Sequence, residues 1–250
     1  ELRKKQRHRK QLMTYAAVSF VVLVMAVILS LTVFFQISEI TVSGSSPYTD
    51  EQIIDASGIS LGENVIRCKA DAVSENLAKN LPYIDSASVE RSLSGKVKIT
   101  VKTTTPVWSV INGEQSIMIN AKGKVLELGA PEKALEATII QGVTVTHAVP
   151  GEEVSFDFVK EIGDAVASSG LDKLTTLNLV DIDYIQALYD GRLTIIIGST
   201  DNLAKKLALT AKVIERENEI DPDQYGTIDL TIEDKLYFRP AENDESADDE

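Results

Sequence analysis

The chain has 250 residues, of which 44% are hydrophobic, and carries a formal net charge of −13. This acidic balance argues against binding to nucleic acid, because phosphate backbones are recognised by positively charged surfaces. The single cysteine, Cys68, excludes an internal disulfide framework. We expect Cys68 to be a partly buried apolar residue, which is the usual state of a free cysteine.

The N-terminus combines a basic tail with a long uncharged segment. Six Lys and Arg residues lie within residues 3–10, and the 24 residues from Leu12 to Phe35 carry no charge. As a helix, such a segment spans ~36 Å, which exceeds a hydrocarbon core of about 30 Å. The pattern predicts a cytoplasmic tail at 1–11 and a transmembrane helix at 12–35, with the rest extracytoplasmic. The alternative is a cleaved signal peptide, but its apolar core would be shorter, about 7–15 residues.

The segment after the membrane helix begins with a strand and two helices. Apolar and polar residues alternate over 40–43, which indicates a strand. Thr49 and Gln52 have the spacing of a capping box at the start of a first helix. We expect Asp71 to cap a second helix, which Pro82 ends.

Two further strands follow, with apolar residues at every second position. Val97, Ile99 and Val101 alternate with lysines and a threonine, so this strand has one apolar and one basic face. Residues 36–103 are therefore predicted to form a three-stranded sheet, with both helices packed on its apolar face. The lysine face is interpreted as the solvated side of the sheet.

Residues 104–240 are predicted to form a larger, mostly antiparallel β domain with two helices. Its predicted strands, separated by turns rich in Asn and Gly, are 106–111, 116–119, 124–128, 138–140, 174–180, 184–188 and 192–197. An apolar face that includes Ile162 and Val166 predicts the first helix, and we expect Thr200 to cap the second. The acidic tail at 241–250 is expected to be disordered.

The sequence offers no recognisable catalytic, cofactor or metal motif. His8 lies in the basic tail, and His147 is the only other histidine, so a histidine-based triad or metal cluster cannot be assembled. The only tryptophan, Trp108, lies in an alternating strand, where we expect it to pack in the core rather than to stack on a sugar.

Carboxylates leave one enzymatic alternative open. The adjacent Glu152 and Glu153, or the pair Asp181 and Asp183, could in principle form the acid pair of a glycan hydrolase. Such an acid needs an apolar pocket that raises its pKa, whereas both pairs lie in polar, turn-like sequence. The solvated interpretation is therefore preferred.

The last ordered stretch is the main candidate for binding. Ile228, Leu230 and Ile232 alternate with polar residues and are expected to face the core. A strand at an open sheet edge offers free N–H and C=O groups to a partner's strand. The candidate partner-binding residues alternate between the two faces of this stretch; they are Ile232, Lys235, Leu236, Tyr237, Phe238 and Arg239.

Several segments resemble the FtsQ/DivIB family of bacterial cell-division proteins, in its Gram-positive style. "FQISEITVSG" and "NLPYIDSASVERSLSGKVKITV" are similar to the family's entry strand and to the end of its first domain. "SIMINAKGKVLE" resembles its Gly-turn strand pair, and "GRLTIIIGSTDNLAKKLALTAKVI" with "GTIDLTIEDKLYFRP" resembles its closing strand–helix–strand pattern. The resemblance implies an α+β protein with a POTRA-like βααββ domain at 36–103, and a β domain at 104–240 with a C-terminal edge strand.

The resemblance further implies a non-enzymatic scaffold at the division septum. Such a protein is a single-pass membrane protein that binds FtsL-type and FtsB/DivIC-type proteins through the last strands of its β domain. Its POTRA-like domain is associated with recruitment to the septum and with other septal proteins. The alternatives are a membrane-anchored peptidoglycan enzyme with a carboxylate active site and a POTRA-type chaperone for secreted chains. The absence of tandem POTRA-like copies counts against the chaperone.

Overall fold

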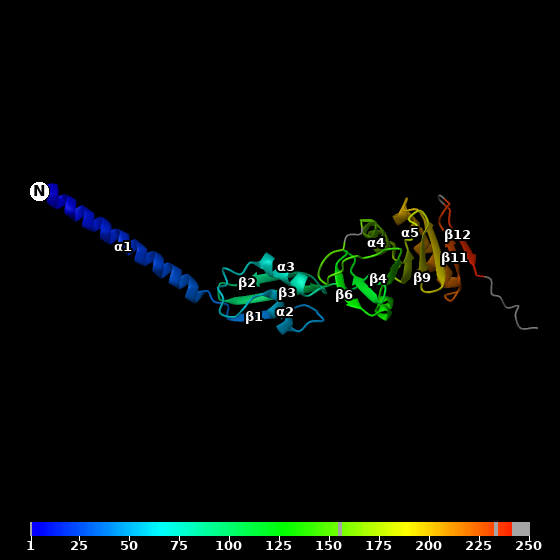
Figure 1. The fold of residues 1–250 in the computed structure, drawn as a ribbon, viewed down its shortest axis with the longest axis horizontal. Helices are drawn as coiled ribbons and strands as arrows, with labels where there is room; N and C mark the ends of the chain where they lie inside the picture. The colour runs from blue at the N-terminus through cyan, green and yellow to red at the C-terminus, as the bar shows by residue number, and fades with distance from the viewer. Residues whose placement is uncertain (1, 155–156, 233–234, 242–250) are drawn as a thin grey trace, which may run out of the picture. The chain divides into compact units, whose positions relative to one another are not determined.

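The computed structural model describes residues 2–154, 157–232 and 235–241 of the chain (Figure 1). The chain divides into two compact units, Glu1–Thr103 and Thr104–Glu250, which are described separately below. Of the tail at 241–250, which is predicted to be disordered, residues 242–250 lie outside the described residues.

The first unit starts with helix α1 (Leu2–Phe34), which contains all but the last residue of the segment at 12–35 that is predicted to cross the membrane. Within the described residues, we find no helix that is both long enough and apolar enough to span a membrane.

A three-stranded sheet follows, with the strand order β1-β3-β2. Its elements are β1 (Glu39–Ser43), α2 (Asp50–Ser57), α3 (Ala70–Asn80), β2 (Ile84–Arg91) and β3 (Lys96–Thr103). Strand β1 runs parallel to β3, and β2 runs antiparallel to it. Val97, Ile99 and Val101 are buried, whereas the alternating Lys96, Lys98 and Lys102 are exposed. The predicted strand–helix–helix–strand–strand order and the apolar inner face are confirmed.

Of the two helix starts predicted in this unit, the start of α2 is confirmed and the cap predicted for α3 is wrong. The capping box predicted at α2 is confirmed, with the Thr49 hydroxyl accepting from the Gln52 N–H and the Gln52 side chain accepting from the Thr49 N–H. Asp71 does not cap α3, because the helix already begins at Ala70 and its N-cap is Lys69. The Asp71 carboxylate instead lies in the first turn, where its negative charge interacts favourably with the positive end of the helix dipole.

The second unit is built on one mixed sheet. Within the described residues the sheet has nine strands in the order β12-β11-β10-β9-β8-β7-β4-β5-β6, and five of the eight neighbouring pairs are antiparallel. The strands are β4 (Trp108–Asn112), β5 (Gln115–Ile119), β6 (Val125–Gly129), β7 (Thr138–Gln141), β8 (Leu174–Asn178), β9 (Ile185–Tyr189), β10 (Leu193–Gly198), β11 (Gly226–Asp229) and β12 (Tyr237–Pro240). The α+β class is confirmed.

Three helical segments accompany this sheet, namely η1 (Pro131–Glu136), α4 (Asp157–Ser169) and α5 (Leu203–Ile220). The two predicted α-helices are therefore present. Thr200 does not cap α5, because the N-cap is Asn202 in the left-handed conformation, with φ 55° and no side-chain capping bond. Thr200 contributes its carbonyl instead, which accepts from the Leu203 N–H at 3.1 Å.

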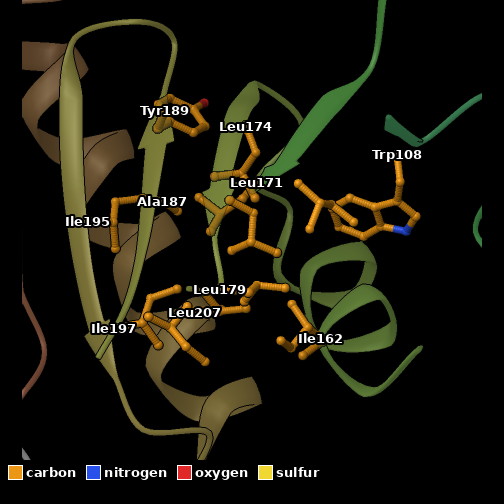
Figure 2. Close-up of a cluster of buried hydrophobic side chains, with 14 of the residues drawn as sticks. Trp108, Ile162, Leu171, Leu174, Leu179, Ala187, Tyr189, Ile195, Ile197 and Leu207 are labelled. Carbon is orange, nitrogen blue, oxygen red and sulfur yellow. The ribbon is translucent and has the colours of Figure 1, made fainter. Parts of the chain in front are cut away.

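The core of this unit lies between the sheet and the two α-helices (Figure 2). Leu207 of α5 is buried beside Ile197 of β10 and Leu179, the residue that follows β8, in this view. Trp108 lies beside α4, where a Cβ at Gly163 would be 3.3 Å from its ring, and is 2% exposed, so its expected packing role is confirmed.

Candidate partner-binding edge

The last two strands form one edge of the nine-stranded sheet (Figure 1). Strand β11 runs parallel to β10, and β12 runs antiparallel to β11, with Ile228 opposite Phe238 and Gly226 opposite Pro240. Within the described residues, β12 has a neighbouring strand on one side only. The sequence prediction of a C-terminal strand at a sheet edge therefore agrees with the observed strand order.

The pairing of β12 with β11 determines which backbone groups of β12 point away from β11. The Ala241 N–H donates to the Tyr225 carbonyl at 2.8 Å, so these two residues form a hydrogen-bonded pair. Such pairs alternate with non-hydrogen-bonded pairs along an antiparallel ladder. Phe238 and Pro240 therefore lie at positions whose backbone groups point outward. Since proline has no N–H, the outward groups are the N–H of Phe238 and the carbonyls of Phe238 and Pro240.

The side chains of the candidate residues separate into two faces. Leu236 and Phe238 are partly buried and pack against the core of the unit. Lys235, Tyr237 and Arg239 are exposed. The alternation predicted from the sequence is thus observed, and Lys235, Tyr237 and Arg239 lie on the solvent-exposed face of the sheet.

Ile232 differs from its predicted position. Ile228 and Leu230 are buried as expected, but Ile232 is 51% exposed and does not face the core. The alternation breaks because Asp229 turns the chain: its carboxylate accepts from the Thr231 N–H at 3.0 Å and from the Thr231 hydroxyl at 2.7 Å. Ile232 consequently lies in the connection between β11 and β12.

Asp229 also links the two strands. Its carboxylate forms an ion pair with the Arg239 guanidinium at 3.2 Å. The hydrogen bonds from the Thr231 side chain and backbone hold the pKa of Asp229 below its ordinary value, burial opposes this, and the charge of Arg239 adds to the lowering. Arg239 is thereby held along the exposed face of β12.

Gly226 is a positioning residue that the sequence analysis missed. A Cβ at this position would lie 2.6 Å from the Phe238 ring and 2.7 Å from the Arg239 carbonyl oxygen. The missing side chain therefore lets the Phe238 ring lie over the β11 backbone. A glycine inside a strand often marks such a close approach, and that signal was available in the sequence.

Arg192 is a second positioning residue that the sequence analysis missed. Its nearly buried side chain donates to the Gln224 carbonyl at 2.8 Å and to the Asn218 side-chain oxygen. Its own carbonyl accepts from the Gly226 N–H at 3.3 Å. Arg192 thus ties the end of α5 and the start of β11 to β10. Its position in an alternating strand gave no sign of this role.

The enzymatic alternative gains no support from the geometry. Glu152, Glu153, Asp181 and Asp183 are all exposed rather than enclosed in an apolar pocket. His147 is exposed as well. In the parts of the chain that the structure describes, no group of three or more His, Cys, Asp or Glu side chains could hold a metal ion.

Cys68 lies in the first unit and is partly buried as expected. Burial raises the pKa of its thiol, while the nearby Arg91 opposes the shift. The Arg91 guanidinium donates to the Cys68 carbonyl.

Comparisons with known proteins point to one family. Residues 35–102 match the family model of the POTRA domain, FtsQ-type. The chain is 26% identical to the cell division protein DivIB of Clostridium acetobutylicum, over 77% of this chain and 78% of the relative. It is 25% identical to the cell division protein FtsQ of Corynebacterium glutamicum, over 82% of this chain and 91% of the relative. A third similar protein is the cell division protein FtsQ of Geotalea daltonii, with 24% identity over 83% of this chain and 77% of the relative.

Proposed function

Because the chain belongs to the FtsQ/DivIB family of cell-division proteins, we propose that it is a non-enzymatic scaffold of the bacterial division machinery. Its partners would be FtsL-type and FtsB/DivIC-type division proteins, one of which adds a strand to β12. The relatives support the division role through their names, and the choice of partners follows from the family resemblance.

The observation that carries this proposal is the open side of β12. Phe238 directs both an N–H and a carbonyl outward, so one residue of a partner strand can donate to it and accept from it. The carbonyl of Pro240 offers a further acceptor. Main-chain hydrogen bonds of this kind supply affinity in strand addition, and side chains supply specificity.

The exposed face of β12 carries residue types that suit an interface. Tyr237 and Arg239 stand on either side of Phe238 and are both exposed. Tyr and Arg are enriched among the residues that contribute most to binding energy. The ion pair with Asp229 orders the Arg239 side chain before any partner arrives.

The proposal includes a membrane location at the septum. Residues 1–11 would remain in the cytoplasm and residues 12–35 would cross the membrane, as their length and charge predict. The FtsQ-type POTRA domain would then follow immediately outside the membrane, where it could contribute to recruitment and contact other septal proteins.

The test is a single backbone change at Phe238. In Phe238→Pro the outward N–H is lost, whereas pairing with β11 is preserved because that pairing does not use it. We expect the full chain to bind the FtsL- and DivIC-type pair at least about tenfold more weakly, as measured by titration calorimetry. Phe238→Val, which shortens the side chain but keeps the N–H, is the matched control and should bind more tightly than the proline variant.

Equal affinity of wild type and Phe238→Pro would contradict strand addition at β12. Thermal unfolding of both variants checks that the β domain remains folded. Truncation at Gly226 is a less specific test, because it also deletes Ile228 and Leu230, which are buried in the core. A peptidoglycan-cleavage assay on the same preparations addresses the enzymatic alternative.

A further inference from the structure

Exposed apolar side chains gather in two connections of the β domain. In the β8–β9 connection, Val180 is 74% exposed, Ile182 is 59% exposed and Tyr184 is 47% exposed. Ile232, in the β11–β12 connection, is also exposed. We call these four residues the apolar rim. The sequence analysis placed Val180 and Tyr184 inside strands, but β8 ends at Asn178 and β9 begins at Ile185.

The strand register places the two connections at one end of the sheet. Asn178 pairs with Gln186, Ile185 pairs with Gly198, and Ile196 pairs with Asp229. The end of β8, the start of β9 and the ends of β10 and β11 are therefore neighbours. Strands β9 and β11 are separated by two strand spacings, about 10 Å, so the two halves of the rim lie within reach of one bound segment.

The β8–β9 connection is held in a fixed turn. The Asn178 side chain accepts from the Val180 N–H at 3.0 Å, and the Asp181 side chain accepts from the Asp183 N–H at 3.0 Å. The Asp181 carbonyl accepts from the Tyr184 N–H at 3.1 Å. These bonds keep the apolar side chains directed to solvent, so a partner would meet them with little ordering cost.

The charges between these side chains indicate what kind of surface fits the rim. Asp181 and Asp183 alternate with Val180, Ile182 and Tyr184, and both carboxylates are exposed. Among the described residues, neither forms an ion pair within the chain. A complementary segment therefore carries apolar side chains together with Lys or Arg. An anionic lipid surface would instead be repelled by the two carboxylates.

We infer that the apolar rim is a second docking surface for the same partner whose strand pairs with β12, and that it binds a basic, apolar segment flanking that strand. This inference rests on the proposed function. Ile232 lies in the connection that leads directly into β12, so a partner chain leaving this end of β12 passes over the rim. The rim adds contact area and charge specificity to an edge that offers few backbone hydrogen bonds.

The test measures the affinity of the full chain for the FtsL- and DivIC-type pair by titration calorimetry. The combined variant Val180→Ser, Ile182→Ser and Tyr184→Ser should weaken binding about tenfold, because truncated apolar anchors lose the largest share of interface energy. The matched control is Ile220→Ser, which changes an isoleucine that is 72% exposed at the end of α5, before the opposite end of β11, and should leave affinity unchanged.

A second variant tests the charge of the segment. The combined change Asp181→Asn and Asp183→Asn should weaken binding about threefold at low salt and reduce the dependence of affinity on salt concentration. An unchanged salt dependence would overturn the basic character of the bound segment.

Phe238→Pro, measured alongside, separates this inference from the proposed function. If Phe238→Pro weakens binding while the serine variant binds like wild type, the rim inference is wrong and strand capture stands. If neither variant weakens binding, the proposed function itself fails. Sedimentation of the wild type as a dimer that the serine variant abolishes would identify the rim as a self-association surface and overturn the inference. Rim-dependent binding to phosphatidylglycerol vesicles would also overturn it.

Discussion

The two edges of the nine-stranded sheet are treated differently. At the start of β6, the segment at 151–154 pairs with residues 123–125: the Val125 N–H donates to the Glu152 carbonyl at 2.9 Å, and the Val125 carbonyl accepts from the Gly151 N–H at 2.8 Å. At β12, no described segment plays this role. Proteins generally protect their sheet edges because unpaired backbone groups recruit other chains. Among the described residues, the two opposite edges of this sheet therefore differ in the backbone groups that they leave available to another chain.

Each edge depends on a glycine that permits close approach. Gly123, with φ 91°, lies under the covering segment, and a Cβ there would come within 2.9 Å of the Val154 carbonyl oxygen. Gly226 lies under Phe238 in the corresponding way. Gly123 thus allows the segment at 151–154 to cover the start of β6, and Gly226 allows β12 to pack on β11. An alanine substitution at Gly123 or at Gly226 therefore tests one of the two sheet edges.

The largest effect is expected for Gly226→Ala. The added methyl group overlaps the Phe238 ring and the Arg239 carbonyl, so β12 must move away from β11. We expect partner affinity to fall by more than tenfold and the free energy of unfolding to drop by about 1–3 kcal/mol, as for other overpacked sites. Calorimetric titration and urea unfolding measure the two quantities. Wild-type affinity in this variant would show that β12 is not the docking strand.

A smaller effect, at the other edge, is expected for Gly123→Ala. Its positive φ and the contact with Val154 together should cost about 1–2 kcal/mol and loosen the covering segment. Hydrogen exchange of the Val125 amide should become faster, and the protein should aggregate more readily at high concentration. Partner affinity should stay unchanged. A loss of affinity comparable to that of Gly226→Ala would mean that the two edges are not independent.

The smallest effect is expected from the titration of Asp229. Its folded pKa lies below its ordinary value, so the carboxylate contributes stability that is complete above about pH 4. This contribution is lost as the pH falls through the lower, folded pKa. Urea unfolding between pH 2 and 6 should show wild type converging toward Asp229→Asn as the pH decreases. Parallel curves across the whole range would contradict the role assigned to Asp229 at the β12 edge.

Much of this architecture could be predicted because local periodicity reflects burial on one face. The alternation of Val97, Ile99 and Val101 identified a strand, and Thr49 with Gln52 identified a helix start, since both signals depend only on nearby residues. The order of strands in the large sheet depends instead on contacts between distant segments. The parallel pairing of β7 between β4 and β8 had no local signal.

For the candidate site, too, the sequence predicted the local alternation of side chains but not the end of the strand. Parity separated Leu236 and Phe238 from Tyr237 and Arg239, but it could not show where alternation stops. The prediction that Ile232 faces the core was wrong because the Asp229 carboxylate accepts a hydrogen bond from the Thr231 N–H, and β11 ends at Asp229, before the alternation in the sequence ends. Asp71 and Thr200 were misassigned as caps because a capping residue is defined by backbone conformation, which the neighbouring turn determines.

The outward-facing ring of Pro240 limits how a tenth strand could align. A strand shifted by two residues along β12 would place one of its carbonyls against Pro240, which has no N–H to donate to it. The shifted alignment thus forfeits a hydrogen bond that the one centred on Phe238 keeps. The missing N–H of Pro240 would in this way favour one register of the incoming strand over the others. Once docked, the incoming strand would itself become the edge strand of the sheet.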